Sequence, residues 1–215
     1  MQNNRKIYLI DLDNCLYKIK DVPGLVNTFE TRITAWLANK LGCSINNAEK
    51  EKVKLYKKFG GAPRCLVRAS IIKNKNELIN CVDFIHDFNV SACGIDKNLN
   101  LKQKLSELDE ELYLFTSSYV KYAKQMLVAL GVLDLFSDII DISKVEYSFK
   151  DETITYTKIF SLLSISPNKI TMVDDSLENL LVASRMGIKK CVWVNHGETK
   201  QRADFVRSIT SIMDL

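Results

Sequence analysis

The chain has 215 residues, of which 47% are hydrophobic and 26% are charged, and its 30 Lys and Arg residues against 26 Asp and Glu residues give a formal net charge of +4. This length and composition indicate a globular protein with a sizeable core, and they exclude a disordered chain, a collagen-like chain and a small disulfide scaffold. The positive charge is too weak for the basic surface of a nucleic-acid-binding protein, so we expect no nucleic-acid polymer as a partner.

The cysteines and the N-terminal residues favour a cytoplasmic protein. None of the six cysteines forms a C-x-x-C pair, and no cysteine–histidine cluster has the spacing of a structural zinc site. Asp11 interrupts the N-terminal apolar run too early for a signal peptide, and no segment approaches the roughly 18 apolar residues that crossing a membrane requires. We therefore expect reduced thiols, a cytoplasmic location and no membrane partner.

The first predicted strand is followed by a long segment with helical spacing. Ile7–Ile10 is a short apolar run of the kind that forms a buried strand. Between residues 19 and 95 no such run is convincing, and apolar residues recur three and four positions apart. The clearest stripe consists of Leu25, Phe29, Ile33, Trp36, Leu37 and Leu41. Asn46–Phe59 and Leu78–His86 are further helix candidates, so we expect an all-helical insertion here.

Strands and helices alternate in the rest of the chain. The predicted strands are Leu112–Phe115, the short run Ile139–Ile142, Ile170–Val173 and Cys191–Val194. Helices are predicted around Leu101–Leu108, up to Gly131, over Thr153–Ser164, and from a Ser176 cap to Gly187. The alternation predicts an α/β fold with a Rossmann-like parallel sheet. We assign residues 1–18 and 96–215 to this core, and residues 19–95 to a helical cap inserted after the first strand.

Polar residues follow three of the predicted strands. Asp11 and Asp13 come after the first strand, Thr116 after the second, and Asp174 and Asp175 after Ile170–Val173. Any one of these residues could be an ordinary turn or helix-capping residue. Ligands of a parallel sheet bind outside the carboxyl ends of its strands, however, and two pairs of carboxylates there favour a functional site.

The chemistry of such a site points to phosphate. Clustered carboxylates repel each other unless a cation joins them, and oxygen ligands without His or Cys favour Mg²⁺. Asp11 and Asp13 are two residues apart, which in an extended segment turns both toward the same side, so one could be a nucleophile and the other a proton shuttle. Thr116 could donate to a phosphoryl oxygen, and phosphoryl transfer also needs a fixed positive charge.

These segments resemble the motifs of the haloacid dehalogenase-like hydrolases. Residues 11–17, DLDNCLY, resemble the first motif DxDNTLY, and Phe115-Thr116-Ser117 resembles the second. Residues 173–176, VDDS, with Asn179 resemble the fourth motif. Lys150 has the spacing of the third, a lysine about 25 residues before the metal-binding Asp175, although Asp151 replaces the usual proline. Lys158 is the alternative for this lysine, but it falls within a predicted helix.

Within this superfamily the chain looks most like the pyrimidine 5′-nucleotidase branch. The supporting segments are DNCLY at 13–17, GAPRCL at 61–66 and DFIHD at 83–87. The chain departs from the branch at Cys15, which stands in place of Thr, and at Ser117-Ser118, which stand in place of Asn-Ala. Neither departure removes a reacting group.

The resemblance implies a role for each reacting residue. Asp11 attacks phosphorus and forms an aspartyl-phosphate. Asp13 protonates the leaving oxygen and then deprotonates the water that releases phosphate. The phosphoryl oxygens are held by Thr116, Ser117 and Lys150. The presence of Asp13 argues against the dehalogenase branch, which needs neither that acid nor Mg²⁺.

The resemblance also implies a metal site and a substrate contact. Mg²⁺ is expected to be held by Asp11, the backbone carbonyl of Asp13, and Asp175, with Asp174 supporting the metal. The cap is expected to close over the site and exclude water. Arg64 could contact the substrate from the cap, with a structural role as its alternative.

Other charged residues have simpler interpretations. His86 is interpreted as structural, with substrate contact as its alternative, and His196 is interpreted as a loop residue. Four lysines within seven residues, Lys52, Lys54, Lys57 and Lys58, are interpreted as a solvated helix face and not as a nucleic-acid site.

The leading function is Mg²⁺-dependent hydrolysis of a small phosphomonoester, with a 5′-mononucleotide as the first substrate class. A sugar phosphate or another metabolite is the alternative substrate, and a mutase would use the same groups. A catalytically silent ligand-binding domain is disfavoured because Asp11, Asp13, Lys150 and Asp175 are all present. The sequence leaves the oligomeric state open.

Overall fold

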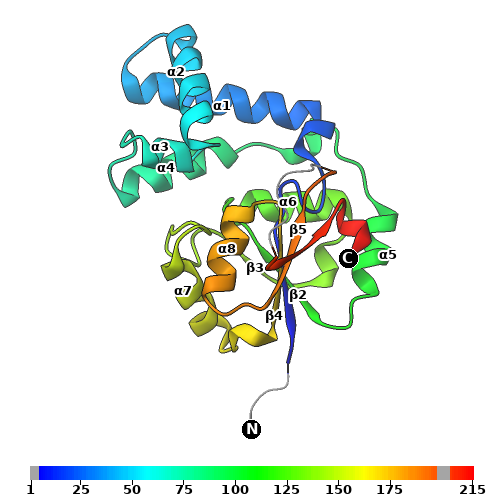
Figure 1. The fold of residues 1–215 in the computed structure, drawn as a ribbon. Helices are drawn as coiled ribbons and strands as arrows, with labels where there is room; N and C mark the ends of the chain where they lie inside the picture. Colours follow the sequence, from blue (N-terminus) through cyan, green and yellow to red (C-terminus); the bar gives the residue numbers. More distant parts are fainter. Residues whose placement is uncertain (1–4, 198–203) are drawn as a thin grey trace. The chain divides into compact units, whose positions relative to one another are not determined.

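The computed structural model describes residues 5–197 and 204–215, which belong to two compact units (Figure 1). One unit comprises the chain up to Asp21 and from Asp96 onward, and the other comprises Val22–Ile95. The sequence boundaries proposed above lie after residues 18 and 95. No helix within the described ranges is both long and apolar enough to cross a membrane.

The first unit is built on a six-stranded sheet in the order β3-β2-β1-β4-β5-β6. Its strands are β1 (Ile7–Ile10), β2 (Glu111–Phe115), β3 (Phe136–Ile140), β4 (Ile170–Asp174), β5 (Lys190–Val194) and β6 (Val206–Ile209). Every pairing between neighbouring strands is parallel. The predicted α/β fold with a Rossmann-like parallel sheet is therefore confirmed.

Two strands differ from their predictions. β3 begins at Phe136, before the predicted run, and it ends at Ile140. Its start was not predicted because its first three residues are partly or fully exposed at the sheet edge. β6 was not predicted, because exposed Arg207 and Ser208 interrupt its apolar pattern on the other edge strand. Edge strands carry weaker hydrophobic signals than central ones since less of their surface is covered.

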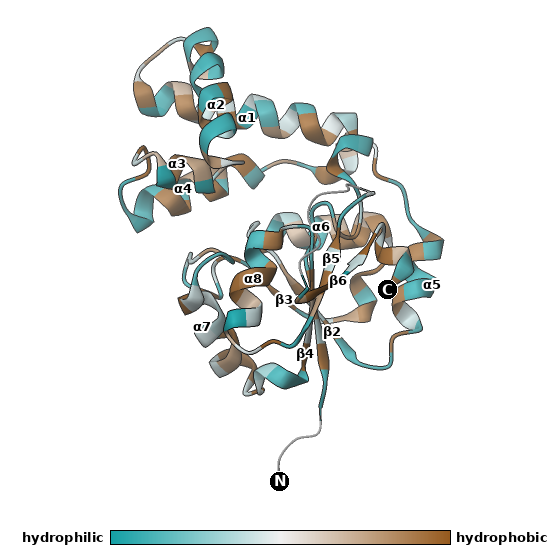
Figure 2. Cartoon of the chain, viewed as in Figure 1, coloured by the Kyte–Doolittle hydropathy of each residue, from teal (hydrophilic) through white to brown (hydrophobic). Residues whose placement is uncertain are grey.

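Helices cover both faces of this sheet. They are α5 (Leu99–Ser106), α6 (Val120–Leu130), α7 (Thr153–Leu163) and α8 (Leu177–Arg185), and short 3₁₀ turns cover Ile19–Asp21, Leu133–Leu135, Pro167–Lys169 and Ile212–Asp214. In Figure 1, α7 and α8 lie on one side of the sheet and α5 lies on the other. Hydrophobic residues concentrate in the strands between them (Figure 2). Tyr156, Ile159 and Leu180 of α7 and α8 pack in one buried cluster with Leu9 and Met172 of the strands.

The helix ends follow the predicted capping residues. Gly131 ends α6 with a φ of 76°, in the left-handed region that favours glycine. The Ser176 side chain accepts a hydrogen bond from the backbone N–H of Asn179 at 3.4 Å and begins α8. Gly187 closes this helix as predicted: α8 ends at Arg185, and Gly187 follows its C-cap Met186 with a φ of 99° while the Ile188 N–H donates to the Ala183 carbonyl at 3.1 Å.

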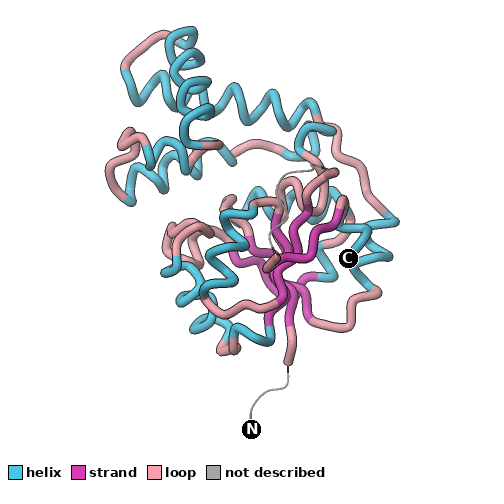
Figure 3. Tube along the Cα trace, in the orientation of Figure 1, coloured by secondary structure: helices cyan, strands magenta, loops and turns pink. Residues whose placement is uncertain are grey.

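In the second unit, Val22–Ile95, the described residues form helices, turns and loops, without a strand (Figure 3). Its helices are α1 (Pro23–Leu41), α2 (Ile45–Phe59), α3 (Arg64–Arg68), α4 (Lys75–His86) and the 3₁₀ turn Val90–Cys93. The predicted stripe of α1 is buried at Leu25, Ile33, Trp36 and Leu37. Its last member, Leu41, is 44% exposed, because the helix ends there.

One of the four clustered lysines is not on a solvated face. The Lys52 side chain is only 2% exposed and forms ion pairs with Glu30 and, at 2.8 Å, with Glu49. Its Nζ also donates to Thr34 Oγ1 at 2.9 Å. The interpretation of Lys52 as a solvated residue is therefore wrong, because α1 packs against α2 at this position. Lys54, which is 73% exposed, does lie at the surface.

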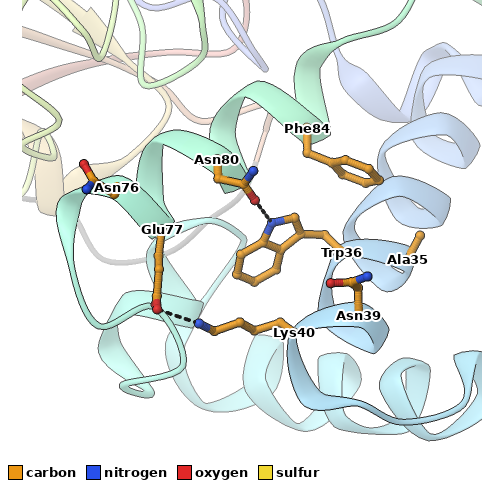
Figure 4. Close-up of a pocket in the computed structure, with 8 residues that line it drawn as sticks. All are labelled: Ala35, Trp36, Asn39, Lys40, Asn76, Glu77, Asn80 and Phe84. Carbon is orange, nitrogen blue, oxygen red and sulfur yellow. Dashed lines mark hydrogen bonds and ion pairs between the residues drawn. The ribbon is translucent and has the colours of Figure 1, made fainter.

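The helical unit also contains a cavity of about 510 Å³ between α1 and α4 (Figure 4). Its polar groups largely satisfy one another. Trp36 Nε1 donates to Asn80 Oδ1 at 3.0 Å, and Lys40 Nζ forms an ion pair with Glu77 at 2.8 Å. His86 is buried nearby in the unit, with Nδ1 2.8 Å from the carbonyl oxygen of Val82, as its structural interpretation predicts.

Candidate active site

The carboxyl ends of the central strands bring the predicted site residues together. Asp11 follows β1, and its backbone N–H donates to the carbonyl of Val173 in β4 at 2.9 Å. Thr116 follows β2, and Asp174 is the last residue of β4. The chain order of the strands reverses on either side of β1, so Asp11 and Asp174 flank the point where such sheets form a crevice.

Lys150 reaches these carboxylates from the loop between β3 and α7. Its side chain is 4% exposed, and its Nζ forms ion pairs with Asp11 and, at 2.9 Å, with Asp174. The same Nζ lies 4.7 Å from the centre of the Phe115 ring. Lys158 instead bonds the carbonyl of Val145 at 3.0 Å from α7. The structure thus brings Lys150 and not Lys158 to the carboxylate cluster.

The charge of Lys150 depends on its partners. Burial by itself lowers the pKa of an ammonium group, but Asp11 and Asp174 more than offset this effect and raise the pKa of Lys150 above its ordinary value. Lys150 is therefore a permanent positive charge at neutral pH, which is what binding of an anionic group requires.

Three carboxylates form a compact oxygen cluster. Asp11, Asp174 and Asp175 each offer an oxygen, and these oxygens lie within 4.8 Å of one another. Burial raises the pKa of Asp11, opposed by Lys150 and reinforced by the neighbouring carboxylates. Burial and the charge of Asp174 raise the pKa of Asp175 to about 7. A donor set made only of carboxylate oxygens fits Mg²⁺, and a divalent cation there favours the ionised forms.

Asp174 is the most tightly held member of the cluster. Its Oδ1 accepts from the backbone N–H of Ser176 and from Asn179 Nδ2, both at 2.9 Å, while its Oδ2 accepts from Lys150. Donors occupy both oxygens, so this arrangement suits a residue that orients its neighbours, as expected for Asp174.

Asp175 is held from the loop that follows β1. Asn14 hydrogen-bonds to the Asp175 side chain, which opposes the rise in its pKa. Asn14 adopts a left-handed φ of 61°, and its carbonyl lies 2.6 Å from His196 Nε2. On the other side, Trp193 Nε1 donates to the backbone carbonyl of Asp175 at 2.9 Å. His196 is a loop residue as predicted, but its contact with Asn14 was not foreseen.

Asp13 does not join the carboxylate cluster through its side chain. Ser118 Oγ donates to Asp13 Oδ2 at 3.0 Å, and Tyr122 OH donates to Asp13 Oδ1 at 2.8 Å. Tyr17 OH also hydrogen-bonds to Oδ1. The sequence analysis missed all three partners. Tyr17 lies within the DNCLY segment and Ser118 within the Ser117-Ser118 departure, but neither pattern indicates a contact with Asp13.

Thr116 is fixed by its own loop. It is buried, and its Oγ1 accepts a hydrogen bond from the backbone N–H of Ser118 at 3.0 Å. A hydroxyl that accepts one bond can still donate its proton to another oxygen. Ser117 is half-buried between them at the same edge. Arg64 belongs to the helical unit, where it begins α3, and its contact with substrate stays a prediction.

Comparison with known proteins identifies the family. The family model described as haloacid dehalogenase-like hydrolase matches residues 11–193, which include all of the Asp, Thr and Lys residues above. The chain belongs to this family. The predicted superfamily and its enzymatic character are thereby confirmed at the family level.

This haloacid dehalogenase-like hydrolase is similar to a yeast protein. It is 27% identical over 144 residues to phosphate metabolism protein 8 of Saccharomyces cerevisiae. This match covers 63% of the chain and 43% of the yeast protein, so the chain spans less than half the length of that relative.

Solved structures share its fold. A HAD phosphatase from Thermococcus onnurineus aligns with a TM-score of 0.60 and 19% identity, over 97% of this chain and 95% of that chain. CbbY from Rhodobacter sphaeroides in complex with phosphate aligns with a TM-score of 0.64 and 16% identity, over 98% and 96%. At these identities the likeness concerns the fold alone.

Proposed function

We propose that this hydrolase is a Mg²⁺-dependent phosphomonoesterase that forms an aspartyl-phosphate on Asp11. The observation that carries the proposal is the meeting of Asp11 with Lys150 beside the oxygens of Asp174 and Asp175. A nucleophilic carboxylate, a buried cation and a set of metal-type oxygens are what phosphoryl transfer through a covalent intermediate needs.

In the first step, a carboxylate oxygen of Asp11 attacks phosphorus, and the bond between phosphorus and the ester oxygen breaks. Its electron pair stays on the leaving oxygen, which takes a proton from Asp13. Lys150 and Thr116 hold the phosphoryl oxygens and offset their charge. In the second step Asp13 takes a proton from water, which attacks the aspartyl-phosphate, releases inorganic phosphate and restores Asp11.

Asp11, Asp175 and the backbone carbonyl of Asp13 are the proposed Mg²⁺ ligands. Asp174 supports them, because Ser176, Asn179 and Lys150 already occupy its two oxygens. Bound Mg²⁺ supplies positive charge to the phosphoryl oxygens and orients them for in-line attack.

We further propose a 5′-mononucleotide as substrate, in the manner of the pyrimidine 5′-nucleotidase branch. Support comes from the segments at 13–17, 61–66 and 83–87, two of which belong to the helical unit. In this proposal the unit acts as a cap and Arg64 contacts the nucleotide. A cytoplasmic location stays a prediction; the six cysteines are free thiols.

Phosphate release from a panel of 5′-mononucleotides and sugar phosphates tests this function. Wild type is assayed with Mg²⁺ and with EDTA, beside Asp11→Asn and the control Asp138→Asn, whose carboxylate pairs with Lys144 at the surface. We expect release that requires Mg²⁺, disappears in Asp11→Asn and persists in Asp138→Asn. Preference for sugar phosphates would reject the nucleotidase assignment. Release by Asp11→Asn at the wild-type rate would reject the covalent mechanism.

A further inference from the structure

Three hydroxyl groups surround the Asp13 carboxylate, and they come from two parts of the chain. Tyr17 belongs to the loop after β1, Ser118 to the loop after β2, and Tyr122 to the first turn of α6. Tyr122 is fully buried, and the Tyr17 and Tyr122 hydroxyls lie 2.7 Å apart. Asp13 itself is half-buried, and a carboxylate with three hydroxyl partners has little freedom to rotate.

The two oxygens of Asp13 have different surroundings. Both tyrosine hydroxyls bond Oδ1, Tyr122 at 2.8 Å, whereas Oδ2 has the single hydroxyl of Ser118 at 3.0 Å. A tyrosine hydroxyl keeps its proton at neutral pH, so two donors face Oδ1. An oxygen that already accepts two hydrogen bonds is a poor place for a further proton.

We propose that Tyr17 and Tyr122 are positioning residues, which anchor Oδ1 of Asp13 and so reserve Oδ2 for proton transfer to the leaving oxygen. This inference rests on the proposed phosphomonoesterase function. Ser118 completes the arrangement, because a serine hydroxyl donates to an ionised Oδ2 and accepts from a protonated one. In the transfer, the O–H bond at Oδ2 breaks, a new O–H bond forms on the leaving oxygen, and Asp13 is left as a carboxylate.

The dependence of the rate on the leaving group isolates this role. A 4-nitrophenolate ion leaves readily without a proton, whereas an alkoxide must be protonated as it departs. The value of kcat/KM reports only the steps up to the loss of the leaving group, so the later hydrolysis of the aspartyl-phosphate does not enter it.

The experiment compares 4-nitrophenyl phosphate with an alkyl phosphate in wild type, Tyr122→Phe and Tyr17→Phe. For Tyr122→Phe we expect kcat/KM to fall roughly 10- to 100-fold for the alkyl phosphate, and much less for the aryl phosphate. Tyr17→Phe should show the same selectivity. The double variant should lose less than the product of the single losses, because both hydroxyls hold one oxygen.

Tyr113→Phe is the matched control, because it removes a tyrosine hydroxyl that bonds Glu111 at 3.2 Å and not Asp13. It should leave the ratio of alkyl to aryl rates unchanged. Equal losses on both substrates in the folded Tyr122→Phe and Tyr17→Phe variants would overturn the inference and indicate a structural role. Unchanged rates would overturn it too. If Tyr122→Phe does not fold, the test rests on the alkyl and aryl rates of Tyr17→Phe, because Tyr17 is only half-buried. A wild type inactive on every phosphate would instead reject the proposed function itself.

Discussion

The ammonium of Lys150 lies 2.9 Å from Asp174 Oδ2, and the same nitrogen forms an ion pair with Asp11. One buried cation therefore joins the ends of two adjacent parallel strands, β1 and β4. A cation in this position stabilises the ionised carboxylates, and in the proposed mechanism it contacts the phosphoryl group.

Replacing Lys150 by Met should abolish most of the activity. We expect kcat/KM for phosphate release to fall by about 100-fold or more, because the variant lacks the charge that offsets the phosphoryl oxygens. Lys158→Met is the matched control, because Lys158 Nζ bonds the Val145 carbonyl and Glu146. The assignment of Lys150 fails if the Lys158 variant loses more activity than the Lys150 variant does.

Removing the side-chain amide of Asn179 should lower the affinity for Mg²⁺. Asn179 Nδ2 donates to Asp174 Oδ1 at 2.9 Å, so Asn179→Ala releases one restraint on the cluster. Loss of such an outer partner lowers metal affinity by roughly 10- to 100-fold. Calorimetric titration with Mg²⁺ measures this affinity, and Asn168→Ala, an exposed change in the same unit, is the control. Equal affinities in the two variants would contradict the supporting role of Asp174.

The sequence predicts the site residues that lie at the ends of strands, because a local apolar pattern and the geometry of a parallel sheet are enough to place them. Asp11, Thr116 and Asp174 each follow an apolar run, and parallel strands bring their carboxyl ends to one edge whatever the details of packing. Lys150 was found by its spacing from Asp175 in a family motif, although no periodicity marks the loop that carries it. Its ion pairs show why the spacing matters, since the loop must return to the centre of the sheet.

The features that the sequence did not reveal depend on packing between distant segments. Tyr122 meets Asp13 only because α6 lies beside the loop after β1, 109 positions earlier in the chain. Lys52 is buried because α1 packs against α2, and the run of lysines in α2 does not indicate which of them is buried. Tertiary contacts of this kind produce no periodic pattern in the sequence, so only the structure reveals them.

The hydroxyl of Thr116 should matter for phosphate binding. Thr116→Val keeps the shape of the side chain but cannot donate to a phosphoryl oxygen or accept from the Ser118 N–H, a bond of 3.0 Å. We expect kcat/KM to fall roughly 10- to 100-fold in this variant. Thr116→Ser keeps the hydroxyl and should stay close to wild type. A serine variant as impaired as the valine variant would show that the methyl group, not the hydroxyl, is needed.

The buried Lys52 should stabilise the helical unit in a pH-dependent way. Lys52 bonds Glu49 at 2.8 Å and Thr34 at 2.9 Å, and it also pairs with Glu30. Lys52→Met should lower the free energy of unfolding by about 1–3 kcal/mol near neutral pH, a modest loss because the two glutamates are half-exposed and regain water. Lys54→Met, which removes an exposed ion pair with Glu51, should change it by less than about 0.5 kcal/mol.

The sign of the pH effect follows from the shifted groups. The hydrogen bonds from Lys52 and Thr34 lower the pKa of Glu49, so the stability that Glu49 contributes is complete above its ordinary pKa and is lost as the pH falls through the lowered value. Burial lowers the pKa of Lys52, but Glu30 and Glu49 more than offset this and raise it, so its contribution persists up to alkaline pH. Denaturant unfolding of wild type and Lys52→Met should therefore differ most near neutrality, with the gap narrowing below about pH 4. A gap that stays the same in acid would mean that Lys52 acts through packing of its alkyl chain and not through the glutamates.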